Sequence, residues 1–331
     1  MIDETNSNLS IEQPTQLNQL LTARGMSERF HPYRAGIPVS GEHFFGKQEE
    51  IRDITSKLLS NGIVVLEGGY RGGKTSLMRE TAERMRKDGQ VSNVEFLDIQ
   101  MYIGESPENI EEVFRQLISR GGKGKTVIAV DELEGYEVTS QERTMRLLDV
   151  LKGFRDEGHF VMIGSIGDLR SDSQKELPKP VKTRLLTDAG DSIVVNKLFD
   201  DSDVRRLVSG GEQPLFTDST VQYLTREAGG HPILANYLAE VLWDLLHSVK
   251  RGDRDIGQIF YDVKKESRSG LSVYFPQTVE CVIGAGFNPL TWEYVGGGRQ
   301  PNNEVYVNML PRYTSTIFRD WLEGYMKRRG R

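Results

Sequence analysis

The strongest constraint on the fold lies in one short segment, where an apolar run meets a glycine-rich turn. Residues 63–67, IVVLE, form a continuous apolar run with the length of a buried strand. The sequence GGYRGGKTS follows directly, and we expect a helix over residues 74–87. Strand, glycine-rich turn and helix in this order predict a phosphate-binding loop within an α/β fold.

The turn contains the full pattern Gly68-x-x-x-x-Gly73-Lys74-Thr75. Glycines let successive backbone N–H groups surround a phosphate, and the helix that follows presents its positive N-terminal end to the same anion. Lys74 can reach the terminal phosphates, and Thr75 can offer its hydroxyl to Mg²⁺. A plain glycine-rich turn is the alternative. The residues expected to bind nucleotide here are Gly68, Gly69, Tyr70, Arg71, Gly72, Gly73, Lys74, Thr75 and Ser76.

Further strand patterns alternate with helical patterns along the first 200 residues. The expected strands after the first are 94–99, 126–131, 159–165 and 192–195. Asn61-Gly62 marks a turn before the first strand, and Ser106-Pro107 supplies a helix N-cap followed by proline at the first helical position. Strands that alternate with helices predict a parallel, doubly wound sheet.

Two carboxylates lie where the strand at 126–131 ends. Asp131 is its last residue, and Glu132 follows directly. The carboxyl end of a parallel strand is where such a sheet opens to a ligand. We expect Asp131 to hold Mg²⁺ through water and Glu132 to act as the general base that orients the attacking water. An isolated Asp-Glu pair is also typical of a capped loop, but the upstream phosphate loop favours the catalytic interpretation.

The strand at 159–165 ends at Gly164-Ser165. In this architecture we expect it to lie between the strand before the phosphate loop and the strand that ends at Asp131. Ser165 could then donate a hydrogen bond to the attacking water or to the γ-phosphate. An ordinary loop serine is an equally good interpretation.

The pattern divides the chain into four regions. Residues 1–28 are polar and predict a flexible arm, and residues 29–200 hold the α/β core. Residues 201–252 predict a helical lid domain with a break at Gly229-Gly230, and residues 256–331 predict a small C-terminal domain. A strand-like stretch at 304–310, EVYVNML, suggests a winged helix there.

Three elements together resemble the AAA+ and STAND ATPases, in particular archaeal and bacterial ATPases near the origin-recognition type. They are Phe44-Phe45-Gly46-Lys47, the pair GGYRGGKTS and VIAVDE, and Gly230-His231-Pro232. The resemblance runs from Pro32 to Leu246. The phosphate loop is common to P-loop proteins in general, whereas the other two elements narrow the family.

The resemblance implies further site residues. The segment from Pro32 to Gly46, with Phe45, would wrap the adenine, and His231 and Pro232 would bring the helical lid against the nucleotide. A trans-acting arginine is expected near the end of the core. Arg184 is the first candidate and Arg170 the second, although each could equally be a surface residue.

Two departures from the family stand out. Lys47 occupies a position where the family usually has arginine, which puts in doubt any contact made by that guanidinium. The chain also lacks the long C-terminal repeat arrays that many STAND proteins use as sensors. The resemblance therefore implies a sensor or effector on a separate polypeptide or in the short C-terminal domain.

Composition limits which partners the protein can bind and which cellular compartment we expect for it. The net charge of -6 and the sequence pI ≈ 5.6 argue against a broadly basic surface for nucleic acid. The basic end Lys327-Arg328-Arg329 still leaves DNA binding open. The single cysteine, Cys281, excludes an intrachain disulfide, and no apolar run reaches membrane-spanning length. With no signal-peptide pattern at the N-terminus, we expect a cytoplasmic protein without a membrane partner.

These features favour an ATP-binding and hydrolysing switch or assembly ATPase that uses ATP and Mg²⁺. We expect it to form a homo-oligomer and to engage a separate partner protein in a nucleotide-dependent way. A DNA-associated loader with a C-terminal winged helix is one alternative. A scaffold that binds nucleotide without turnover is another, against which the intact Lys74, Thr75, Asp131 and Glu132 weigh.

Overall fold

The computed structural model shows a chain that divides into two compact units. The core unit consists of Pro38–Lys197 with Thr278–Met309, and the helical unit contains Leu198–Gln277 with Leu310–Arg331. The structure describes residues 38, 40–41, 44, 46–69, 72–102, 104–120, 124–134, 141–166, 169, 177–190, 192–195, 198–209, 218–247, 256–291, 293–296, 306, 309–311 and 315–330.

The contacts group the C-terminal part of the chain differently from the sequence-based division. Residues 256–331 were expected to form one C-terminal domain, but Thr278–Met309 groups with the core unit. Apolar periodicity shows that an element has a buried face and does not show which neighbour covers it. The boundaries of the lid and C-terminal domains therefore stay predictions.

A five-stranded parallel sheet lies at the centre of the core unit, in the order β2-β3-β4-β1-β5. The strands are β1 (Ile63–Gly68), β2 (Asn93–Asp98), β3 (Thr126–Asp131), β4 (Phe160–Ile166) and β5 (Ser192–Val194). The predicted parallel, doubly wound sheet is confirmed. So is the predicted place of β4 between β1 and β3, which sets the polar strand ends side by side.

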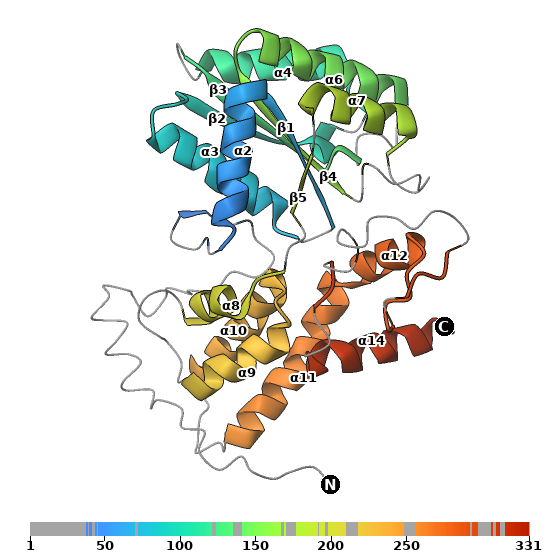
Figure 1. Ribbon diagram of the computed structural model, residues 1–331. Coiled ribbons are helices and arrows are strands. Elements are labelled where there is room, and N and C mark those ends of the chain that lie inside the picture. Colours follow the sequence, from blue (N-terminus) through green and yellow to red (C-terminus); the bar gives the residue numbers. More distant parts are fainter. Residues whose placement is uncertain are drawn as a thin grey trace. The chain divides into compact units, whose positions relative to one another are not determined.

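Helices cover both faces of this sheet, as Figure 1 shows. One face carries α2 (Gln48–Asn61) and α3 (Lys74–Lys87), whose apolar side chains pack with Val64 and Leu66 of β1. The other face carries α4 (Pro107–Arg120), α6 (Gln141–Asp156) and α7 (Lys179–Ala189). There Phe114 of α4 and Phe154 of α6 meet edge to face, with ring centroids 5.6 Å apart.

Local signals in the sequence set the ends of these helices. The Ser106 hydroxyl accepts a hydrogen bond from the Asn109 backbone N–H at 3.2 Å, and Pro107 is the first residue of α4, as its sequence predicts. Helix α2 ends at the expected turn. Gly62 has φ 73°, and its N–H donates to the Leu58 carbonyl at 2.8 Å.

The helical unit is built from amphipathic helices that pack on one another. They are α8 (Asp201–Ser209), α9 (Asp218–Ala228), α10 (Pro232–His247), α11 (Ile256–Tyr274) and α14 (Thr316–Arg328). Phe275 lies at their centre, with its ring centroid 5.1 Å from that of Phe318 and 6.2 Å from that of Trp321. Helix α12 (Pro276–Gly284) follows directly, and all but its first two residues group with the core unit.

A buried carboxylate joins α9 to the first turn of α14. Glu227 is 1% exposed and accepts hydrogen bonds from the Ile317 backbone N–H at 3.0 Å and from the Thr316 hydroxyl at 2.9 Å. The first N–H groups of a helix have no partner within the helix, and a carboxylate there also meets the positive end of the helix dipole. Glu227 therefore stabilises the first turn of α14, together with the N-cap Ser315, whose hydroxyl accepts from the Phe318 N–H at 3.1 Å.

The strand-like stretch at 304–310 does not form a strand at Tyr306, which is helical. Its side chain is fully buried, and its ring centroid lies 5.7 Å from that of Phe287. Alternating apolar residues over so few positions suit a strand or a buried turn of helix, and packing on Phe287 favours the helix here. The only bridge that the described part of this region contains is the antiparallel pair Phe287–Tyr294.

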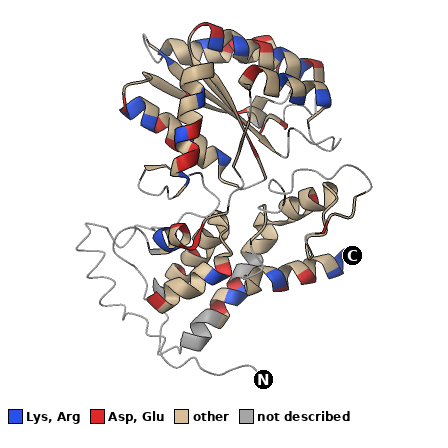
Figure 2. Ribbon diagram, in the orientation of Figure 1, with Lys and Arg blue, Asp and Glu red and all other residues tan. Residues whose placement is uncertain are grey.

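Figure 2 shows that the outer helices of the core unit, α4 and α6, carry both acidic and basic residues. Several of these form ion pairs one helical turn apart, such as Arg115 with Glu111 and Arg146 with Glu142. Exposed pairs of this kind stabilise a helix only slightly. Within the described ranges, no helix combines the length and the apolar character needed to cross a membrane.

We predict that Glu227→Ala lowers the free energy of unfolding of the helical unit by about 1–3 kcal/mol, because a buried backbone N–H loses its acceptor. A urea titration followed by tryptophan fluorescence measures this, since Trp321 lies in α14. Glu323→Ala, an exposed change on the same helix, is the control and should stay within about 0.5 kcal/mol of the wild type. Equal midpoints for Glu227→Ala and the control would contradict the assigned role.

Candidate active site at the carboxyl edge of the sheet

Polar residues gather where β1, β3 and β4 end. The register pairs Glu67 of β1 with Ser165 of β4, and Val130 of β3 with Ile163 of β4. Asp131 therefore lies beside Gly164 at the next position. The phosphate loop leaves β1 at this same edge and leads into α3. Parallel order thus places the loop, one carboxylate and one serine within a single small region.

The loop enters α3 through a left-handed glycine and keeps its lysine close. Gly73 has φ 88° and ψ 15°, a conformation that glycine adopts without the strain a side chain would add. The Lys74 ammonium donates hydrogen bonds to the Gly68 carbonyl at 3.1 Å and the Gly69 carbonyl at 2.9 Å. Lys74 is only 7% exposed, so its charge lies within the loop rather than in bulk solvent.

A residue far along the chain also reaches this loop. Met309 is buried, and its sulfur occupies the place where a side chain at Gly69 would project, 2.7 Å from an ideal Cβ. A side chain at position 69 would displace the flexible Met309 side chain. Met309 therefore packs directly on the phosphate loop, within the core unit.

Thr75 and Asp131 contact each other across the site. The Thr75 hydroxyl donates a hydrogen bond to Oδ2 of Asp131, which joins the start of α3 to the end of β3. A hydroxyl and a carboxylate side by side are the hard oxygen ligands that Mg²⁺ takes when phosphates and waters complete its shell. These two residues fit the metal ion that their sequence pattern implies, and they would hold it.

Gly164 makes space for this carboxylate. A Cβ built on Gly164 would overlap Oδ1 of Asp131 and would lie 3.2 Å from Cε of Met78. Asp131 is 9% exposed and also accepts a hydrogen bond from the Glu132 backbone N–H at 3.0 Å. Its two oxygens are thus directed by α3 on one side and by its own loop on the other.

Glu132 has an unusual backbone for a residue with a side chain. Its φ is 57°, in the left-handed region that glycine favours. Such a conformation costs about 1–3 kcal/mol and persists where the surroundings impose it, often at functional sites. Glu132 is partly exposed and follows Asp131 directly, at the carboxyl edge of the sheet.

Ser165 is fully buried, and its hydroxyl donates to Oε1 of Glu134 at 2.6 Å. The same Oε1 accepts a hydrogen bond from the Ile166 backbone N–H. The other oxygen, Oε2, is buried and has no hydrogen-bond partner among the described residues, although Glu134 as a whole is partly exposed. Burial raises the pKa of the Glu134 carboxyl to about 7, while the hydrogen bond from Ser165 and the charge of Lys74 lower it.

A second buried carboxylate, Glu67, lies one position before the phosphate loop. Its Oε1 accepts from the Ser192 hydroxyl at 2.7 Å, and its Oε2 accepts from the Leu169 backbone N–H at 2.8 Å. Glu67 is fully buried. It joins β1 to β5 and to the residue at 169 after β4, so it fixes the strand ends under the site.

The structure describes only part of the segment from Pro32 to Gly46, which is expected to wrap the adenine. Gly46 is buried with φ 70°, and the neighbouring Lys47 ammonium donates to the Val195 carbonyl at 2.7 Å. Lys47 thus ties this segment to the end of β5. Of the other predicted site residues, Gly72 donates its N–H to the Gly69 carbonyl at 3.3 Å, and Ser76 lies in the first turn of α3. Pro32, Phe45, Tyr70, Arg71 and Arg170 lie outside the described residues.

His231 and Pro232 belong to the helical unit. Pro232 is the first residue of α10, and the buried His231 ring packs edge to face on Phe275 at 5.0 Å. The preceding Gly230 carbonyl accepts a hydrogen bond from the Phe199 N–H at 2.8 Å. These contacts lie within one unit, and the predicted approach of the two residues to nucleotide stays a prediction.

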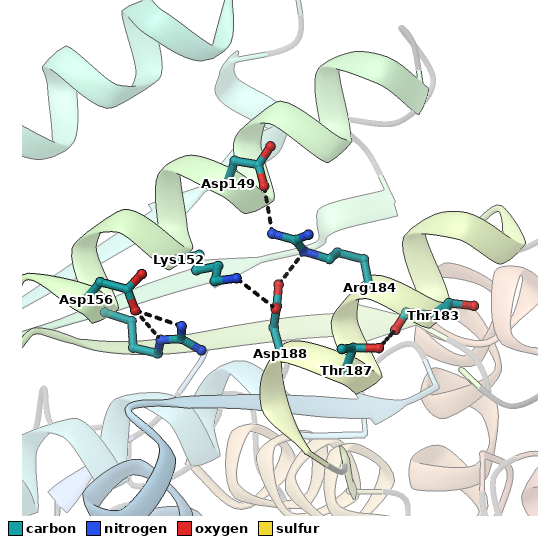
Figure 3. A network of polar contacts seen from close by, with 8 residues as sticks. Asp149, Lys152, Asp156, Thr183, Arg184, Thr187 and Asp188 are labelled. Carbon is teal, nitrogen blue, oxygen red and sulfur yellow. Dashed lines mark hydrogen bonds and ion pairs between the residues drawn. The ribbon is translucent and has the colours of Figure 1, made fainter.

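Arg184, the expected trans-acting arginine, lies in a network of ion pairs between α6 and α7. Figure 3 shows its guanidinium between Asp149 and Asp188, at 2.7 and 2.5 Å. Lys152 approaches Asp188 at 3.8 Å. The Arg184 side chain is 28% exposed. In this structure it therefore links two helices, and its role across an interface stays a prediction.

Sequence reasoning missed four residues of the site: Glu67, Glu134, Gly164 and Met309. One signal was available, because Glu67 is an acidic residue inside a run that reads as a buried strand, and a buried carboxylate needs partners. Glu134 was hidden within an acidic stretch after β3. The contacts of Gly164 and Met309 join distant parts of the chain, and no local pattern reports them.

Residues 64–179 match the family described as ATPase family associated with various cellular activities (AAA). The match begins in β1, contains the phosphate loop and the carboxylates after β3, and ends at the first residue of α7. This stretch is therefore similar to the AAA family. No curated protein sequence matches the chain.

Solved structures resemble the fold at low sequence identity. Caenorhabditis elegans PCH-2 has a TM-score of 0.51 and 11% identity, over 70% of this chain and 71% of that one. The Thermotoga maritima RuvB Holliday junction branch migration motor has a TM-score of 0.48 and 15% identity, over 76% and 82%. Aeropyrum pernix ORC1 in complex with DNA has 0.46 and 13%, over 96% and 87%. The likeness to PCH-2 shows a common fold, and the two lower scores carry no argument.

We predict that Gly164→Ala weakens magnesium-dependent ATP binding about tenfold, because the added methyl displaces the Asp131 carboxylate from Thr75. Titration with a fluorescent ATP analogue, with Mg²⁺ and with EDTA, separates the metal-dependent part. The affinity in EDTA should change little.

Gly153→Ala is the matched control, since a methyl at this position in α6 meets no atom within 4 Å. This change should leave ATP affinity unaltered and raise stability slightly, as alanine favours a helix. Unchanged magnesium-dependent affinity in Gly164→Ala would show that Asp131 does not need this space.

Proposed function

We propose that the chain is an ATPase that binds ATP with Mg²⁺ at the carboxyl edge of the sheet, hydrolyses it, and changes its contacts with partners as it does so. The observation that carries this proposal is the meeting of Thr75 and Asp131 beside the buried Lys74, at the end of a parallel sheet. The match of residues 64–179 to the AAA family supports the same conclusion.

Binding rests on the loop and on Lys74. The ammonium now bonds to the carbonyls of Gly68 and Gly69. A triphosphate offers a stronger acceptor at short range, so Lys74 would exchange these neutral carbonyls for phosphate oxygens. The N–H groups at the start of α3 and the positive end of that helix would bind the same anion.

Hydrolysis rests on the carboxylates after β3. Magnesium held by Thr75 and Asp131 would neutralise charge on the phosphates. Glu132 would accept a proton from the attacking water, since it follows Asp131 directly and its carboxylate is partly exposed. The left-handed backbone at Glu132 turns the chain just after the metal ligand, which supports a role there rather than in the core.

A conformational switch is supported by how the chain passes between the two units. The chain crosses from one to the other at residues 197–198, 277–278 and 309–310. Met309 stands at the last of these crossings and packs on Gly69 of the phosphate loop. A nucleotide that changes the conformation of this loop would therefore displace Met309, where the chain passes into the helical unit. Different contacts made by ATP and ADP would then favour different arrangements.

We predict that Lys74→Ala lowers ATP affinity about 10- to 100-fold, because charge-assisted hydrogen bonds to phosphate are lost. Glu132→Gln should retain ATP binding while kcat falls about 100- to 10,000-fold. Isothermal titration calorimetry measures the first change, and phosphate release measures the second. Glu142→Gln, an exposed change on α6, is the control for both. Wild-type turnover in Glu132→Gln would overturn the assigned mechanism.

We also predict that Glu132→Gln with ATP forms a larger assembly than the same variant with ADP, because ATP persists at the site. Light scattering after size exclusion measures this. If Arg184 acts across the interface, Arg184→Ala lowers turnover in the assembly and leaves ATP affinity of dilute protein unchanged. The same mass with either nucleotide would contradict nucleotide-dependent assembly.

A further inference from the structure

Glu134 is a partly exposed acidic residue with a buried carboxylate oxygen, and the proposed function has no role for it so far. It is three residues beyond Asp131 and lies against the end of β4 through Ser165 and Ile166. Ser165 is itself fully buried. The carboxylate therefore holds in place the one hydroxyl that β4 brings to the edge between β1 and β3.

The two oxygens of Glu134 differ in their surroundings. Oε1 accepts from both the Ser165 hydroxyl and the Ile166 N–H, whereas Oε2 is buried and has no partner among the described residues. A buried carboxylate oxygen without a hydrogen bond is costly, and such oxygens in folded proteins are usually satisfied by water or by a ligand. Oε2 can therefore accept a hydrogen bond from a donor that the described residues do not supply.

The place of Glu134 indicates what that donor is. The Ser165 hydroxyl donates to Glu134, and Ser165 pairs in register with Glu67, the residue directly before Gly68 of the phosphate loop, so Glu134 lies beside that loop. The donor is then a small group that can enter a buried position beside the phosphates. Water meets this requirement, whereas a phosphate oxygen would bring negative charge against a carboxylate.

We propose that Glu134 is a positioning residue for ATP hydrolysis, whose Oε1 fixes the Ser165 hydroxyl and whose Oε2 accepts a hydrogen bond from a water molecule at the reaction site. This inference rests on the proposed function. It gives the two carboxylates separate tasks. Glu132 takes the proton, and Glu134 orders the serine and the water around it.

Glu134→Gln tests the role of Oε2 and keeps the hydrogen bonds that Oε1 accepts from Ser165 and Ile166. The Ile166 N–H can only donate, so the amide oxygen must face it and the NH₂ group must take the place of Oε2. The variant thus exchanges an acceptor for a donor at that one position. We expect kcat to fall about 10- to 100-fold, with ATP affinity within about threefold of the wild type and an unchanged melting temperature.

Ser165→Ala and Glu134→Ala test the hydrogen bond between the Ser165 hydroxyl and Oε1 of Glu134. If Glu134 acts partly through Ser165, the two changes are not additive in kcat, and Glu134→Ala costs little more when Ser165 is already alanine. Glu142→Gln again serves as the surface control. Should Glu134→Ala fail to fold, Glu134→Gln and Ser165→Ala decide the matter.

Wild-type kcat in Glu134→Gln, or a loss of ATP affinity in place of kcat, would overturn the proposal. So would a lower melting temperature with normal turnover of the folded protein, since that shows a structural role alone. Failure of the proposed function itself looks different, because Lys74→Ala would then bind ATP normally and Glu132→Gln would turn over normally.

Discussion

The contact between the Thr75 hydroxyl and the Asp131 carboxylate is the interaction on which the site depends. It joins two elements that are 56 positions apart in the chain, the first turn of α3 and the last residue of β3. The contact exists because β4 lies between β1 and β3 and carries no side chain at Gly164. Strand order, strand register and one glycine together bring a hydroxyl and a carboxylate to the distance at which one cation can bind both.

Two carboxylates with buried oxygens, those of Glu67 and Glu134, join the strand ends at the same edge. Glu67 joins β1, β5 and the residue after β4, and Glu134 joins the segment after β3 to the end of β4. Burying a carboxylate is costly unless hydrogen bonds compensate, so each fixes its surroundings closely. Three of their four oxygens have donors, and the fourth, Oε2 of Glu134, has none among the described residues. The edge is thus a prearranged polar network with one place left for a donor.

The core unit is completed by a distant segment. Thr278–Met309 groups with the sheet, and Met309 fills the space above Gly69. The chain then passes at Leu310 into the helical unit, where Glu227 stabilises the first turn of α14. The residue at which the chain leaves the core unit thus contacts the phosphate loop.

The sequence alone determined the parallel sheet, the phosphate loop and the pair Asp131-Glu132, because strand patterns, glycine spacing and helix caps act over a few residues. The caps at Ser106 and Gly62 formed as their local chemistry requires. Only the tertiary structure decided the contacts of Glu134, Gly164 and Met309, and the division of residues 256–331 between two units. Tyr306 is helical, against its strand-like pattern, and packs on Phe287. Each of these depends on which distant surface covers a residue, and a periodic pattern records only that some surface does.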